Sequence, residues 1–223
     1  MKKLKIFAII FAVAILFSAC NFDMQSEALD NISDIRYNIF EAKTENLTAT
    51  IMCGMRENPY EYDGISNPKC EFGIITITYK VRPETETIPY TLRVGSAIFE
   101  GDLEENPYDH TYMVDIEKLI DNNAEVFLAI DGLESELQFT CISADWAVQY
   151  GDALTIALEN VSEQLPQFFS NKKFKAECYL KIIFDKKSTT APYFWYFGII
   201  GESTAAIALI IDTETGEILT KSV

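Results

Sequence analysis

Apolar and polar residues alternate along most of the first 142 residues of the chain. In the clearest stretch, Ile75, Ile77 and Tyr79 alternate with Thr76 and Thr78. Successive side chains of a strand point to opposite faces, so this pattern is typical of a strand with one buried and one solvated face. Six further stretches of this kind begin at residues 35, 47, 88, 112, 126 and 133.

These predicted strands are short and are separated by turn signals, of which Asp131-Gly132 is a tight hairpin turn. Seven antiparallel strands of this length predict a β-sandwich over residues 34–142. A short helix over residues 116–122 is expected at one edge of it.

The pattern changes at Ser143. Apolar residues then recur at 3.6-residue spacing from Trp146 to Leu165, which predicts an amphipathic helix that ends at Pro166. A helix on an antiparallel sheet is therefore expected for residues 143–223, and the fold class is mainly β: an N-terminal antiparallel β-sandwich followed by a C-terminal α+β domain. The strand-like runs of this second half lie at 175–184, 192–200, 204–211 and 217–220.

The N-terminal segment has a different character. A cationic start is followed by an apolar run of twelve residues, 6–17, which is too short to span a bilayer. The small pair Ser18-Ala19 and then Cys20 come next. This arrangement resembles a bacterial lipoprotein signal, which implies removal of residues 1–19, acylation of Cys20, a tether over 20–33 and a lipid-anchored place on the extracytoplasmic face of the cell membrane. An ordinary cleaved signal, with Cys20 as a plain thiol, is the alternative.

Composition narrows the range of partners. The formal net charge is −16 and 48% of the residues are hydrophobic. Such a chain folds into a globular structure, whereas nucleic-acid binding needs a cationic surface and is excluded. Carboxylates at Asp63, Asp102, Asp109 and Asp131 would suit a divalent cation. No D-x-D-x-D-G run groups them, so neither a metal nor another cofactor is expected.

Four cysteines remain once Cys20 is assigned to lipid: Cys53, Cys70, Cys141 and Cys178. Outside the cytoplasm an even set of cysteines can be oxidised, and three pairings are possible. A Cys53–Cys70 bond would close one loop, and a Cys141–Cys178 bond would tie the two halves of the chain. All four residues lie among apolar strand positions, where a free thiol acts as a small hydrophobe. The sequence therefore allows these four cysteines to be either disulfide-bonded or free.

The second half carries a family resemblance. The segment Trp195-Tyr196-Phe197 and the ending from Ile207 to Ile218, which contains Asp212-Thr213-Glu214-Thr215-Gly216, resemble a PepSY domain over residues 143–223. The resemblance implies a helix packed on an antiparallel sheet and a non-catalytic role in restraining or guiding peptidases of the cell envelope. In the ending itself, the Asp212 side chain can accept backbone N–H bonds, and Gly216 can adopt a positive φ.

Candidate catalytic groups are few. His110 is the one histidine, and no G-x-S-x-G motif accompanies it. Residues 170–173 fit S-x-x-K within a polar loop, and paired carboxylates such as Glu104-Glu105 are typical of solvated faces. Zinc-peptidase, Walker and dinucleotide motifs are absent. We therefore expect no enzymatic activity and no catalytic residue, and a hydrolase built on His110 or an acidic pair ranks last.

One short motif occurs twice, as Glu57-Asn58-Pro59-Tyr60 and as Glu105-Asn106-Pro107-Tyr108. Asn-Pro initiates turns, so turn chemistry alone accounts for the repeat. If the two loops share one end of the sandwich, their side chains would instead form a binding patch suited to a protein interface or to sugar rings. The residues of that patch would be Arg56, Tyr60, Tyr62, Tyr108 and His110.

These observations predict a membrane-anchored, extracytoplasmic binding or regulatory protein that restrains or guides an envelope peptidase by surface contact. The alternative is a surface lipoprotein that binds a glycan or another small ligand.

Overall fold

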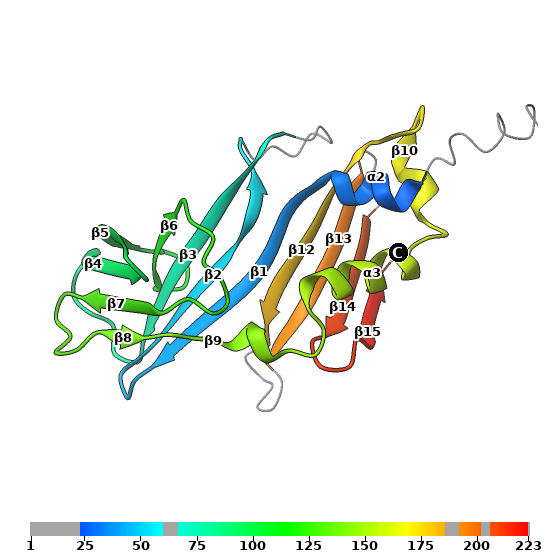
Figure 1. Cartoon of the computed structure of the whole chain (residues 1–223). Coiled ribbons are helices and arrows are strands. Elements are labelled where there is room, and N and C mark those ends of the chain that lie inside the picture. The colour runs from blue at the N-terminus through cyan, green and yellow to red at the C-terminus, as the bar shows by residue number, and fades with distance from the viewer. Residues whose placement is uncertain (1–22, 60–66, 186–191, 202–205, 223) are drawn as a thin grey trace, which may run out of the picture.

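The computed structural model describes residues 23–59, 67–185, 192–201 and 206–222 (Figure 1). It is mainly β, as predicted, with 54% strand and 14% helix. The helices are α2 (Met24–Asp30) and α3 (Tyr150–Asn160), and two 3-10 turns, η1 (Ile142–Asp145) and η2 (Leu165–Phe168), flank α3. The strands are β1 (Ile32–Lys43), β2 (Leu47–Glu57), β3 (Lys69–Tyr79), β4 (Thr87–Val94), β5 (Ala97–Glu105), β6 (Tyr112–Ile116), β7 (Val126–Ile130), β8 (Leu137–Gln138), β9 (Thr140–Cys141), β10 (Phe169–Ser170), β11 (Lys173–Phe174), β12 (Ala176–Phe184), β13 (Tyr193–Gly201), β14 (Ala206–Asp212) and β15 (Ile218–Ser222).

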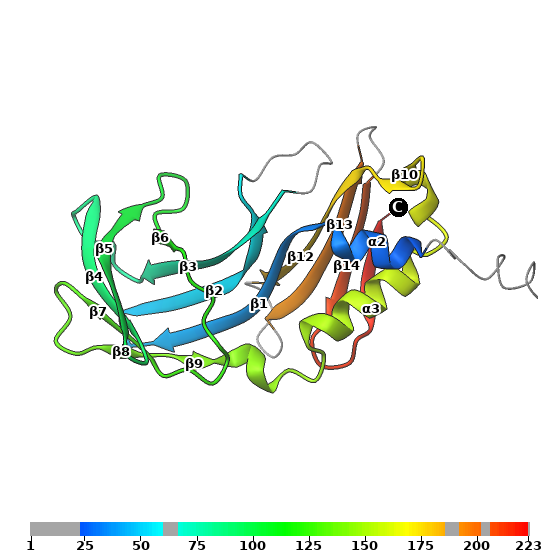
Figure 2. The ribbon, with the colours of Figure 1, turned by 45° about the horizontal axis from the view of Figure 1, so that its top comes forward.

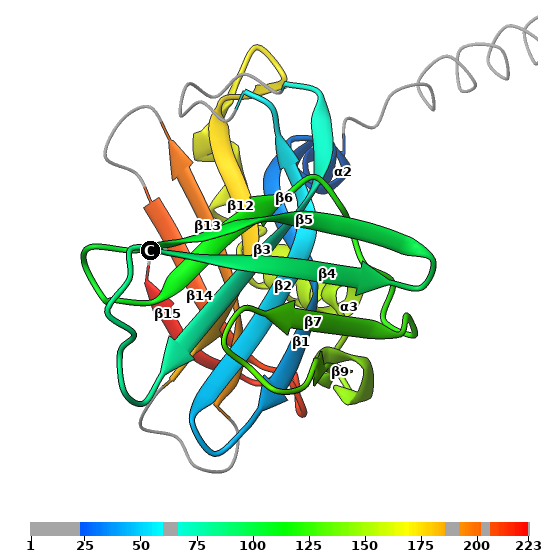
Figure 3. The same ribbon diagram turned by 90° about the vertical axis from the view of Figure 1, so that its left-hand side faces the viewer.

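Thirteen strands of the described residues belong to one mixed sheet, in place of the two stacked sheets expected for a sandwich. The order is β15-β14-β13-β12-β1-β2-β3-β6-β5-β4-β7-β8. Strand β9 comes one residue after β8 and pairs back with β1, so the strands from β1 to β9 form a closed ring (Figure 3). Closure pairs the edges that an open sheet leaves to solvent, and for that reason the ring is favoured over two separate sheets.

Strand β1 belongs to both halves of the chain. Its first residues pair in parallel with β12, where Ile35 lies opposite Leu180, and its last residues pair with β9, where Phe40 lies opposite Cys141. Along its other edge it pairs antiparallel with β2, with a register shift between Arg36 and Asn38. The parallel pairing of β1 with β12 joins the ring to the C-terminal strands β12–β15.

Two hydrophobic clusters lie on opposite faces of β1. Ile35 and Ile39 pack into the cluster beneath α2 and α3, whereas Phe40 and Ala42 pack into the cluster inside the ring. Figure 2 shows α2 and α3 on one face of the strands β13 and β14. In the first cluster Trp195 is 1% exposed, and its indole N–H donates to the carbonyl of Val148 at 2.9 Å. A strand buried on both faces in this way holds the two clusters in a single structure.

The helical segments differ from the prediction in three places. The expected helix at 116–122 is irregular, because side chains of neighbouring strands bind its backbone: Asn38 donates to the Ile120 carbonyl at 2.8 Å, and Glu71 accepts from the Leu119 N–H at 3.2 Å. The helix expected up to Pro166 is shorter, with α3 ending at Asn160. Part of the predicted tether is the helix α2, which the side chain of Asp23 caps.

Strand β5 has no counterpart among the predicted strands. Of its nine residues only Leu103 is buried, so the alternation that marks a half-buried strand is missing from it. By contrast, the prediction for the C-terminal turn is confirmed. The carboxylate of Asp212 accepts from the N–H groups of Glu214 and Thr215 at 2.9 and 2.8 Å, and Gly216 has a φ of +72°.

The close packing of β12 on β13 can be tested at Gly198. A Cβ atom at this position would lie 2.4 Å from the ring of Tyr179. We expect Gly198→Ala to lower the free energy of unfolding by about 1–3 kcal/mol in urea titrations, because the added methyl displaces the ring. In a Tyr179→Ala background the same substitution should cost less.

Gly151 in α3 is the matched control, because a Cβ atom there meets open space. Gly151→Ala should raise stability through helix propensity. Equal destabilisation by Gly198→Ala with and without the Tyr179 ring would contradict the contact.

Candidate functional site

The structure separates the two Asn-Pro-Tyr motifs. Arg56 lies opposite Cys70 at the start of β3, whereas Tyr112, just after the second motif, lies opposite Ile77 near the end of β3. The two loops therefore lie at opposite ends of this strand and do not form one patch. Tyr60 and Tyr62 lie outside the described residues.

The described members of the predicted patch have partners of their own. The guanidinium of Arg56 pairs with Asp115 at 2.8 Å and lies over the ring of Phe72. Nδ1 of His110 lies 2.7 Å from Glu105, and Arg82 pairs with the other carboxylate oxygen of Glu105 at 2.6 Å. The hydrogen bond from His110, together with the charge of Arg82, lowers the pKa of Glu105. His110 therefore has a structural partner that fixes its loop. Tyr108, in the same loop, is 94% exposed.

The four cysteines that could have paired are free thiols. Cys53 and Cys70 cannot form a disulfide. Cys53 lies opposite Gly73, and Gly73 is three residues along β3 from Cys70. This separation of about 10 Å is longer than a disulfide can span. Cys141 lies opposite Phe40 and Cys178 opposite Ile32, so these two are separated by most of β1. Burial raises the pKa of the Cys53 thiol to about 12, which keeps it protonated and unreactive.

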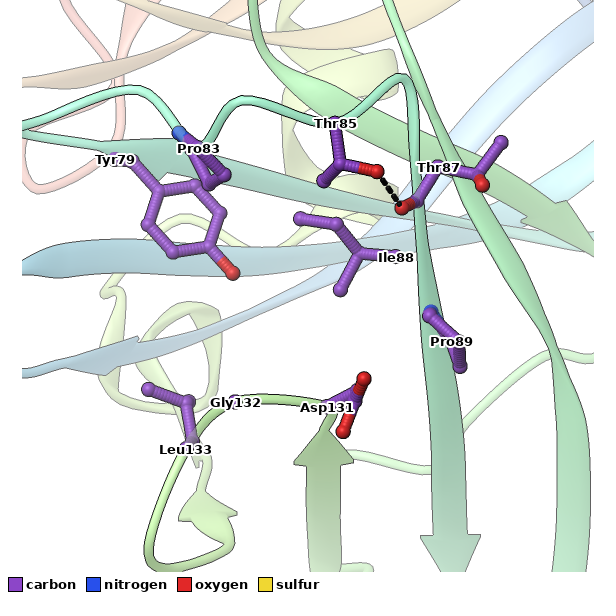
Figure 4. Close-up of a pocket in the computed structure, with 9 residues that line it drawn as sticks. All are labelled: Tyr79, Pro83, Thr85, Thr87, Ile88, Pro89, Asp131, Gly132 and Leu133. Atoms are coloured by element: carbon purple, nitrogen blue, oxygen red, sulfur yellow. Dashed lines mark hydrogen bonds between the residues drawn. The ribbon is translucent and has the colours of Figure 1, made fainter.

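A cavity of about 500 Å³ opens at one end of the ring (Figure 4). We call it the end pocket. It lies where β3 ends, β4 begins and the turn after β7 passes across the opening. Its lining residues are Tyr79, Pro83, Thr85, Thr87, Ile88, Pro89, Asp131, Gly132 and Leu133.

The walls of the end pocket are tied to the ring. The Tyr112 hydroxyl donates to the carbonyl of Thr85, and the ring of Tyr79 stands edge-on to that of Tyr112 with centroids 5.8 Å apart. On the other side, the N–H of Asp131 donates to the Pro89 carbonyl at 3.1 Å. The buried Tyr112 side chain thus holds one wall and a backbone hydrogen bond holds the other, so that the pocket is preformed.

The end pocket combines an apolar lining with a small number of polar groups. Figure 4 shows the hydroxyl of Tyr79 pointing into the space between Ile88 and Leu133, with the carboxylate of Asp131 across from it. Burial and the neighbouring phenol of Tyr112 raise the pKa of Tyr79, so its hydroxyl stays protonated and can donate. The carboxylate of Asp131 supplies an acceptor.

Sequence patterns alone did not point to this pocket. Tyr79 fits the buried face of a strand, and Asp131-Gly132 fits a hairpin turn, so neither stands out. The one chemical role that the sequence suggests for Asp131 is that of a cation ligand. Among the described residues no group of three or more His, Cys, Asp and Glu is arranged to hold a metal ion.

No protein-family model, curated protein or solved structure matches this chain. Over the described ranges, none of the helices has the length and apolar character needed to cross a bilayer.

The role of Glu105 as the anchor of the His110 loop can be tested by pH. Its pKa is lowered in the folded chain, so its stabilising contribution is present above the ordinary pKa of Glu and is lost as pH falls through the lowered value. We expect Glu105→Gln to reduce the free energy of unfolding at pH 7, and to reduce it by a smaller amount at about pH 3.

The exposed Glu100 on the same strand is the control for this measurement. Urea titrations of Glu100→Gln should show little change at either pH. A loss of stability in Glu105→Gln that is equal at both pH values would show that the charge of Glu105 does not hold the loop.

Proposed function

We propose that the protein is a lipid-anchored, extracytoplasmic binding protein that takes a small, largely apolar ligand in the end pocket. The observation that carries the proposal is the preformed cavity into which the hydroxyl of Tyr79 points. A ligand that fits would have an apolar body, an acceptor for the Tyr79 hydroxyl and a donor for Asp131. Pockets at the mouths of barrels commonly receive ligands of this kind.

The position of the end pocket relative to the N-terminus supports this proposal. Helix α2 begins a few residues after Cys20, and β1 leads from α2 toward the end pocket. The twelve residues of β1 span about 40 Å. The pocket lies beside the turn after β1, where the backbone N–H of Lys80 donates to the Asn46 carbonyl at 2.9 Å. With acyl chains on Cys20, the pocket would open away from the membrane, where a ligand can reach it.

A second proposal rests on the resemblance of residues 143–223 to a PepSY domain, and the arrangement of these residues supports it. Helix α3 packs on β13 and β14, and the Asp212 turn connects β14 to β15 in the last hairpin, as in a PepSY-like unit. Such a unit would act by contact with an envelope peptidase. The support for this role is a likeness of fold, and fold does not determine function, so ligand binding in the end pocket is the first proposal.

Ligand binding can be measured with 2-naphthol, a fluorescent probe that has an apolar body and one hydroxyl. We expect saturable binding to the intact mature chain, and about tenfold weaker binding to Tyr79→Phe, which loses one hydrogen bond. Tyr108→Phe is the matched control, because this tyrosine is exposed and does not line the pocket. Equal dissociation constants for the two variants, or no saturable signal, would contradict the proposed site.

The lipid anchor can be tested separately by fatty-acid labelling in cells. We expect the intact chain to carry the label in the membrane fraction, and Cys20→Ser to lose both the label and the membrane association. Cys70→Ser serves as the control because Cys70 is a free thiol elsewhere in the chain. A labelled, membrane-bound Cys20→Ser variant would overturn the anchor.

A further inference from the structure

A second depression, of about 480 Å³, lies on the face of the sheet that carries α3. We call it the cross-strand groove. The groove lies on this face because two of its lining residues also belong to the packing beneath α3. Ile39 is part of that hydrophobic cluster, and Tyr193 packs against it. The groove crosses β1, β2 and β3, between the end of β12 and the loop before β6. Its lining residues are Ile39, Glu41, Lys43, Thr48, Thr50, Met52, Thr78, Asp109, Thr111, Phe184 and Tyr193.

An exposed aromatic platform forms one end of the groove. Phe184 is 53% exposed and packs against Tyr193, with ring centroids 5.0 Å apart. Tyr193 in turn packs against Trp146, with ring centroids 6.0 Å apart, and its hydroxyl donates a hydrogen bond to the Glu41 carboxylate at 3.3 Å. An exposed apolar ring that already packs against a neighbouring ring is suited to contact with a ligand, since it loses less conformational freedom on binding.

The floor of the groove is a set of side-chain hydroxyls on adjacent strands. Thr48 lies opposite Lys43 on one side and Thr78 on the other, and Thr50 lies opposite Glu41. Each threonine hydroxyl can both donate and accept a hydrogen bond. Here β2 is paired along both edges, so no backbone edge is free for an extended peptide to join the sheet. A ligand in the groove must therefore bind to side chains.

The charges of the groove restrict the ligand further. The carboxylate of Glu41 is paired with Lys43 at 2.8 Å, and Asp109 adds a second carboxylate at the far end. The groove is therefore slightly acidic, within a chain of formal net charge −16. An anionic polymer would be repelled from this surface, whereas a neutral one would not.

We propose that the cross-strand groove binds a neutral glycan chain, with one sugar ring on Phe184 and sugar hydroxyls bonded to Thr48, Thr50 and Glu41. Hydroxyl groups that both donate and accept match the threonine floor, and the apolar face of a sugar ring matches the aromatic platform. The groove spans about 15–20 Å across the strands, enough for several sugar units. This binding does not depend on the end pocket, because Thr78 and Tyr79 point to opposite faces of β3.

Isothermal titration calorimetry with the neutral oligosaccharides chitotetraose and cellotetraose tests the proposal on the intact mature chain. At least one of them should bind, and tetragalacturonate, an anionic chain, should not. Phe184→Ala and Thr50→Val should each weaken binding about tenfold, through lost ring contact and through one lost hydrogen bond.

The controls make the same chemical changes on β4 and β7, whose residues do not line the groove. Phe127→Ala removes a half-buried ring that lies beneath Arg93, and Thr91→Val removes a hydroxyl from β4. Both should leave the affinity unchanged, as should Tyr79→Phe, which reports on the end pocket alone. The near-isosteric Thr50→Val variant keeps the test valid if Phe184→Ala fails to fold.

Three outcomes would overturn the glycan site. One is the absence of binding by both neutral oligosaccharides at millimolar concentration, and another is a preference for the anionic chain. The third is binding that is equally strong in wild-type protein, Phe184→Ala and Thr50→Val. None of these outcomes bears on 2-naphthol binding in the end pocket, so the two proposals succeed or fail separately.

Discussion

The structure depends on burying both faces of one strand. On β1, Ile35 and Ile39 face the cluster beneath the helices, while Phe40 and Ala42 face the interior of the ring. Side chains alternate with a period of two, so a slip of one residue would move each set into the wrong cluster. The two clusters together therefore specify the register of β1, and the shift between Arg36 and Asn38 lets it meet β2 and β12 at the same time.

Both candidate binding sites follow from this arrangement. The ring is closed and filled, so ligands have access only to its end and to its outer face. Tyr79 and Thr78 are neighbours on β3, yet one lines the end pocket and the other the groove. Each site has an aromatic anchor: the buried Tyr112 lies below the first, and the partly buried Trp146 lies beside the second. Rigid walls of this kind reduce the conformational entropy that a ligand must overcome.

Sequence patterns predicted most of the strands because at least one face of each is buried. They failed for β5, because Leu103 is its single buried residue and no alternation of apolar and polar residues marks the strand. They also predicted a helix at 116–122, where contacts from Asn38 and Glu71 to the backbone produce an irregular segment. The turn at Asp212 was predicted correctly, because a carboxylate that binds nearby N–H groups and a glycine with positive φ act locally.

The sequence by itself determined which residues of most strands face a core and where the helix of the second half begins. Only the tertiary structure decided that β9 returns to β1, that the two Asn-Pro-Tyr loops lie at opposite ends of β3, and that Asp131 comes to face Tyr79. The reason is physical: alternation and turn chemistry are local, whereas strand pairing is chosen by the joint burial of faces that are distant in the chain.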